Sequence, residues 1–173
     1  MRSGRTAASR RESSSLALNL TGSQHGTGNN ALGGRRLCVT EQKDDLIRAL
    51  NVALGAEYGA LWLLPQHMAQ VEDEELKRQL GLIADVELEH AEKTARLIYA
   101  LGGEPNADLP QLKPRKGVKE ILEAHVQAER DAIAIYTNAL RLANDPEMRK
   151  TLEELRTDEE GHQRLLERAL ARL

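Results

Sequence analysis

The sequence has very few aromatic residues and a single cysteine. It contains no phenylalanine, one tryptophan and three tyrosines among 173 residues. Because β-strands favour aromatic and β-branched side chains, this composition favours amphipathic helices and an all-α fold. Cys38 alone excludes an internal disulfide, a CxxC redox pair and a cysteine-based zinc or iron–sulfur site. We therefore expect a reducing, cytoplasmic environment.

The sequence also has no long apolar run and no excess of positive charge. No stretch approaches the roughly 18 apolar residues that a membrane span requires, so we expect no membrane insertion. The formal net charge is −3, with 24 basic and 27 acidic residues. A chain without a basic surface has no electrostatic support for binding nucleic acid. The length suits one domain with a substantial core.

The first 40 residues differ in composition from the rest of the chain. They are rich in arginine, serine and glycine, have one acidic residue, Glu12, and show no apolar periodicity. Such a segment buries too little apolar surface to offset its ordering entropy, so we predict a disordered tail at residues 1–40. A solvated tail or an over-extended start is the simpler interpretation. Organelle import is the alternative, because the same composition fits a transit peptide.

Residues 41–173 show the apolar spacing of four amphipathic helices. The predicted helices span residues 41–70, 73–101, 117–143 and 146–172. Asp73 and Asn144-Asp145-Pro146 are typical helix-start signals, and Gly102-Gly103 is a typical stop. Pro65 lies inside the first helix and predicts a kink or an early end.

The connections between these helices predict the topology of a four-helix bundle. Two connections are short, so the first and second helices, and the third and fourth, should form antiparallel hairpins. The connection at residues 102–117 is long enough to run the length of the bundle. We therefore predict an all-α four-helix bundle, with two hairpins joined by one long crossover.

Acidic residues and histidines interrupt the apolar seam of every predicted helix near its middle. These residues are Glu57, Glu87, His90, Glu129, Glu159 and His162. Glu57 and Glu87 are 30 residues apart, as are Glu129 and Glu159, and each second glutamate begins a Glu-x-x-His sequence. The midpoints of both pairs fall at the predicted hairpin turns, so all six side chains should lie at one height. The repeated spacing indicates a duplicated hairpin.

Four carboxylates buried in an apolar core require compensation by positive charge. No lysine or arginine lies on the predicted seams, whereas two divalent cations would balance four carboxylates and two neutral imidazoles. Carboxylate and imidazole ligands suit iron or manganese, and the lack of thiolates argues against structural zinc. A lone Glu-x-x-His occurs readily by chance. The doubled arrangement makes these six residues the predicted metal ligands and catalytic residues.

Other histidine and aromatic residues near the predicted site have less defined roles. His125 lies one turn before Glu129, and it could be an extra ligand or, more simply, a hydrogen-bond partner of the ligands. Tyr136 is a further possible neighbour of the ligands. Tyr136, Tyr58 and Trp62 could also donate electrons to an oxidised centre, although packing in the core is the simpler interpretation. Neither His67 nor His25 is predicted to have a role.

The residues quoted above resemble the pattern of ferritin-like dimetal carboxylate proteins. Within that superfamily, residues 42–172 most resemble bacterioferritins. The motifs that carry the resemblance are Glu87-Leu-Glu-His-Ala-Glu, Leu101-Gly-Gly-Glu-Pro-Asn, Ala128-Glu129 and Asp158-Glu-Glu-Gly-His162. The resemblance implies that Glu57 and His90 bind one metal, that Glu129 and His162 bind the other, and that two carboxylates bridge them. The implied bridges are Glu87 and Glu159.

Two departures from bacterioferritins change what the resemblance implies. Leu88 occupies the position of the haem-ligating methionine, so haem is not expected. The sequence ends with the fourth helix and lacks the short fifth helix of that family, so we expect a homo-oligomer that is a dimer or larger rather than a particular cage. Rubrerythrins are the second resemblance, but their rubredoxin-like cysteine knuckle is absent, so electrons would come from another protein.

The leading functional prediction is a di-iron protein that oxidises Fe(II) with O₂ or H₂O₂ for iron detoxification or storage. Its cofactors would be two iron ions, with manganese as the alternative. A rubrerythrin-like peroxide reductase or a di-iron oxygenase would use the same centre. A non-catalytic helical interaction module is the alternative from another functional class, and it would bind no metal.

Overall fold

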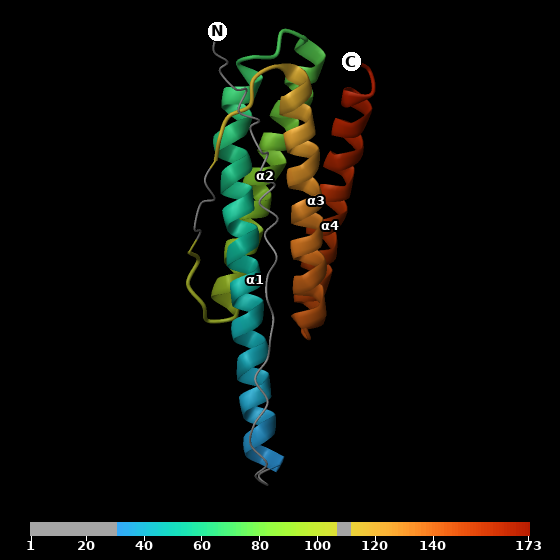
Figure 1. Cartoon of the computed structure of the whole chain (residues 1–173). Coiled ribbons are helices and arrows are strands. Elements are labelled where there is room, and N and C mark those ends of the chain that lie inside the picture. Colours follow the sequence, from blue (N-terminus) through green and yellow to red (C-terminus); the bar gives the residue numbers. More distant parts are fainter. Residues whose placement is uncertain (1–30, 107–111) are drawn as a thin grey trace, which may run out of the picture. The chain divides into compact units, whose positions relative to one another are not determined.

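The computed structural model describes residues 31–106 and 112–173, and all regular structure within these ranges is α-helical. The helices are α1 (Ala31–Met68), α2 (Glu74–Ala100), α3 (Val118–Leu142) and α4 (Pro146–Leu170). Helices α1 and α2 run antiparallel, as do α3 and α4, and the crossover returns the chain to the end of the bundle where α3 begins (Figure 1). The predicted all-α bundle of two antiparallel hairpins is confirmed.

Local capping interactions determine where α2 and α4 begin. The carboxylate of Asp73 accepts a hydrogen bond from the backbone N–H of Leu76 at 2.7 Å. The carboxylate of Asp145 accepts one from the N–H of Met148 at 2.8 Å, and Pro146 occupies the first turn of α4. These contacts satisfy backbone donors that have no partner within the helix. The sequence signals therefore predict both helix starts to within one residue of their positions in the structure.

Helix α1 differs from its prediction at its first residue and at its proline. It begins at Ala31, ten residues before the predicted start at residue 41. Extending an existing helix adds one hydrogen bond for each residue ordered, and this stretch contains no proline to prevent it. Pro65 is followed by three further helical residues, and its carbonyl accepts a hydrogen bond from Ala69 N–H at 3.2 Å. The prediction for residues 1–30, which include His25, lies outside the described residues.

The core has two apolar clusters. One contains Leu50, Leu54, Tyr136 and Leu152 among its members, and the other contains Leu64, Leu80, Leu122 and Leu166. Along each helix, the predicted metal ligands lie between residues of one cluster and residues of the other. The clusters therefore place apolar side chains on both sides of a buried polar layer.

Two aromatic residues differ in exposure from their predicted packing. Tyr58 and Trp62 were expected to pack in the core, but their exposures are 42% and 47%. Along the helices of residues 31–106 and 112–173, no segment is both long and apolar enough to cross a membrane.

Candidate metal centre

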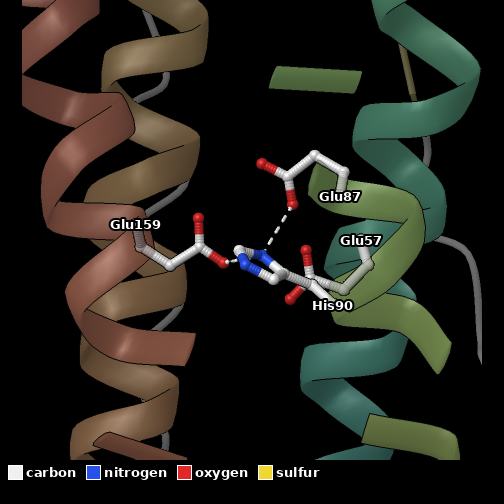
Figure 2. A group of neighbouring side chains, drawn as sticks. All are labelled: Glu57, Glu87, His90 and Glu159. Carbon is white, nitrogen blue, oxygen red and sulfur yellow. Dashed lines mark ion pairs between the residues drawn. The ribbon is translucent and has the colours of Figure 1, made fainter. Parts of the chain in front are cut away.

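All six predicted ligands converge at the middle of the bundle. Each of the four helices contributes at least one of them. All six are buried, with exposures from 0% to 9%. They form two overlapping groups in which the ligand atoms lie within 4.8 Å of one another. One group is Glu57, Glu87, His90 and Glu159, and the other is Glu87, Glu129, Glu159 and His162. The side chains of the first group face one another across the helices (Figure 2).

The two shared glutamates each direct one oxygen to each histidine. Nδ1 of His90 lies 3.0 Å from Oε1 of Glu159 and 3.3 Å from Oε2 of Glu87. Nδ1 of His162 lies 3.0 Å from Oε1 of Glu87 and 3.2 Å from Oε2 of Glu159. Each carboxylate therefore uses its two oxygens on opposite sides, as a ligand that bridges two neighbouring cations must.

Three atoms of this cluster are buried without a well-directed hydrogen bond. They are Oε2 of Glu87, Nδ1 of His90 and Oε1 of Glu159. Buried polar atoms are normally hydrogen-bonded, so such a group requires an explanation. A cation between the three atoms would satisfy them together. The donor set of carboxylate oxygens and imidazole nitrogens also fits iron or manganese.

The metal-free cluster balances its charge with protons. Burial alone would lower the pKa of both histidines, but the carboxylates of Glu159 and Glu87, which lie 3.0–3.3 Å from the ring nitrogens, raise it to about 10 for His90 and about 9 for His162. Burial and repulsion by neighbouring carboxylates raise the pKa of Glu129 to about 11, and the pKa of Glu57 is also raised.

The two shared glutamates behave in the opposite way. Burial alone would raise the pKa of Glu87 and Glu159, but the nearby imidazoles of His90 and His162 lower it. These directions favour carboxylates at Glu87 and Glu159, imidazolium ions at His90 and His162, and neutral carboxylic acids at Glu57 and Glu129. With that distribution of protons the charges of the six groups cancel.

Residues around the six ligands form a further layer of contacts. Tyr136 is fully buried, and its hydroxyl donates to Oε1 of Glu57 at 2.5 Å. The hydroxyl of Thr94 lies 3.0 Å from that of Tyr136. Because the tyrosine proton points to Glu57, Thr94 is the donor in this second contact. Nε2 of His90 lies 3.4 Å from Oδ2 of Asp158, a residue that the sequence did not predict as part of the site.

His125 pairs with His67 rather than with a predicted ligand. Nε2 of His67 accepts a hydrogen bond from the backbone N–H of Arg115, so Nδ1 of His67 carries its proton. That Nδ1 lies 2.9 Å from Nε2 of His125, to which it donates. Burial and the nearby His67 lower the pKa of His125 to about 4. The sequence did not predict a role for His67, and only the register between α1 and α3 could have identified this pair.

Comparison with known proteins agrees with this geometry. The ferritin-like domain family matches residues 47–173. A bacterioferritin of Rhodobacter capsulatus is 33% identical over 129 residues, which cover 70% of this chain and 80% of the relative.

Solved structures give the same result. A ferritin-like diiron-carboxylate protein from Bacillus anthracis strain Ames has a TM-score of 0.69 and 30% identity, over 75% of this chain and 97% of that chain. The bacterioferritin of Desulfovibrio desulfuricans, described with a diiron site, has a TM-score of 0.68 and 28% identity, over 77% of this chain and 82% of that chain. The chain therefore belongs to the ferritin-like family, with bacterioferritins among its relatives.

Proposed function

We propose that this protein binds two iron ions at the centre of its bundle and oxidises Fe(II) with O₂ or H₂O₂, for iron detoxification or storage. The observation that supports this most strongly is the orientation of Glu87 and Glu159, each with one oxygen toward each histidine. Two ions sharing both carboxylates can lose one electron each in a single event. The bacterioferritin relatives favour iron over other metals with a similar ligand preference.

The residues divide between the two proposed ions by their position. Glu57 and His90 would hold one ion, and Glu129 and His162 would hold the other, with the shared glutamates between them. The apolar clusters on both sides limit access of water to the ions. Fixing ligand number and orientation in a buried site is the protein's contribution to metal chemistry.

The proposed reaction balances for either oxidant. Two Fe(II) ions lose two electrons in total and become two Fe(III) ions. With H₂O₂ the O–O bond breaks, and the electrons and two protons give two water molecules. With O₂ the same electrons and two protons give one H₂O₂. No external reductant is needed when iron itself is the substrate.

Anaerobic loading with Fe(II), followed by air or H₂O₂, tests this function. We expect about two irons per chain, because the site contains two overlapping ligand groups, and a rise in near-ultraviolet absorbance on oxidation. Glu159→Ala should lose both signals. Glu154→Ala, on the exposed face of the same helix, is the matched control and should keep them.

Other outcomes would favour the rival functions. Turnover of peroxide or an organic substrate only when a reductant is added would favour a peroxide reductase or an oxygenase. No binding of metal, together with full stability in a chelator, would favour an interaction module. Size exclusion separates a storage shell from a dimer.

Leu88 predicts that the purified protein has no haem absorbance, because leucine has no atom that can ligate iron. The bacterioferritin of Rhodobacter capsulatus has been solved with haem iron, so the family resemblance alone does not decide this point. Any haem band in the visible spectrum of the purified protein would contradict the prediction.

A further inference from the structure

The duplicated hairpin allows the two proposed metal positions to be compared residue by residue. Each ligand has a counterpart 72 positions later: Glu57 with Glu129, Glu87 with Glu159, and His90 with His162. The same offset pairs each neighbouring residue of one metal position with a residue of the other. A difference between two counterparts is therefore a difference between the two positions.

Two residues outside the six predicted ligands form hydrogen bonds with them, and both bonds involve ligands of the same metal position. Tyr136 donates to Glu57, and Asp158 contacts Nε2 of His90, the ring nitrogen that faces away from the shared carboxylates. The counterparts of Tyr136 and Asp158 are Leu64 and Val86, which have no polar side-chain atoms.

The second metal position lacks this support. Among residues 31–106 and 112–173, the side chains of Glu129 and His162 pair only with other members of the six-residue site. They are also closer to solvent. Their side chains are 7% and 11% exposed, whereas that of His90 is fully buried.

We propose that the two metal positions are inequivalent, with the Glu57–His90 position retaining its ion and the Glu129–His162 position exchanging its ion with solvent. This inference rests on the proposed function. The hydrogen bond from Tyr136 fixes the orientation of Glu57, so less order is lost when Glu57 binds a cation. The Asp158 carboxylate increases the basicity of the His90 nitrogen that faces the ion. Nothing comparable orients Glu129 or His162.

Tyr136 is expected to contribute more than Asp158. The Tyr136 hydroxyl is fully buried and only 2.5 Å from Glu57, while Asp158 is 47% exposed and 3.4 Å from His90. Water competes with an exposed contact, and it cannot compete with a buried one. Both are positioning residues, because each acts on the metal through a ligand.

An anaerobic titration of the metal-free chain with Co(II), followed by calorimetry and visible absorbance, tests the inference. The wild type should bind Co(II) in two steps of about one ion per chain, with affinities separated by about tenfold or more. Glu129→Ala should remove the weak step and keep the tight one. Glu57→Ala should remove the tight step.

The positioning variants give the sharper test. Tyr136→Phe should weaken the tight step about tenfold and leave the weak step unchanged, and Asp158→Asn should do the same by a smaller factor. Tyr99→Phe, which removes an exposed hydroxyl from α2, is the matched control and should change neither step. Circular dichroism and thermal unfolding of the metal-free variants show whether each has folded. Should Tyr136→Phe fail to fold, Asp158→Asn at the exposed position decides the question.

The possible failures are distinguishable. Two equal affinities in the wild type, or a Tyr136→Phe variant that weakens both steps equally, would overturn the inference and leave the proposed function intact. No binding of Co(II) or Fe(II) at all would overturn both.

Discussion

At the scale of single residues, the site exchanges protons for metal. In the metal-free chain the pKa of Glu57 is raised, and the pKa values of Glu129, His90 and His162 are raised to about 11, 10 and 9, which favours the protonated form of each group. Metal ligands must lose these protons, so loading should release up to about four per chain, and affinity should rise with pH between about 6 and 8. Calorimetry in buffers of different ionisation enthalpy measures the number released.

A matched pair of variants checks that these protons come from the site. His162→Ala should reduce the number released, whereas Glu89→Gln, on the exposed face of α2, should not. Metal binding without proton release would show that these four side chains are not protonated in the metal-free chain.

The buried pair of His67 and His125 gives a second prediction at this scale. The pKa of His125 is about 4 in the folded chain, against 6.5 when it is unperturbed. Below pH 6.5 the unfolded chain therefore takes up a proton that the folded chain refuses. The free energy of unfolding should fall as the pH drops from about 6.5 to about 4, by at most about 1.4 kcal/mol per pH unit for this group.

Urea unfolding of the metal-free wild type and of His125→Gln at pH 7 and pH 5 measures this effect. The wild type should lose more stability than the variant on acidification, because glutamine does not titrate. If the difference in unfolding free energy between the wild type and His125→Gln were the same at pH 7 and pH 5, His125 would not be a buried neutral histidine.

At the scale of helices, capping residues contribute stability that the sequence already indicates. Asp145→Ala removes the acceptor for Met148 N–H at the start of α4 and should lower the free energy of unfolding by about 1 kcal/mol. Asp131→Ala, an exposed substitution within α3, is the comparison. Chemical denaturation measures both, and equal effects would mean that the cap contributes nothing specific.

The same scale shows what the sequence could and could not predict. Caps, prolines and apolar spacing are local, so the ends of α2, α3 and α4 followed from them within two residues. The six converging side chains followed because the hairpin is repeated with constant spacing. The start of α1 could not be predicted, because a helix that extends into a stretch without apolar periodicity leaves no local signal in the sequence.

Contacts between helices were the other omission. Asp158 reaches His90, and His67 reaches His125, only because of how far each helix is rotated and shifted against its neighbour. Moving ten residues along α1 from Glu57 and eleven back along α3 from Tyr136 leads from one contact pair to the other, so a single known contact would have predicted the second. No such contact is visible in the sequence. The fold and the convergence of the six side chains were thus predictable, whereas the contacts made by Asp158 and His67 were not.

At the scale of the whole molecule, the polar layer makes stability depend on metal. Two apolar clusters hold the four helices together, and the layer that interrupts them contains charged groups whose burial is costly. A ligand that binds the folded chain but not the unfolded chain stabilises the fold, by about 2.7 kcal/mol for one site at a free concentration of 100 times Kd. Metal should therefore stabilise the entire bundle rather than one helix.

Thermal unfolding with and without Fe(II) or Co(II) under argon measures this coupling. We expect metal to raise Tm by at least about 5 °C, since about 1 kcal/mol shifts Tm by about 2–4 °C in a domain of this size. A chelator should reverse the shift. Glu159→Ala should show little shift because it removes a carboxylate shared by both ions, while the exposed Glu154→Ala should match the wild type. An equal rise in Tm for both variants would mean that the metal stabilises the chain from a place other than the central layer.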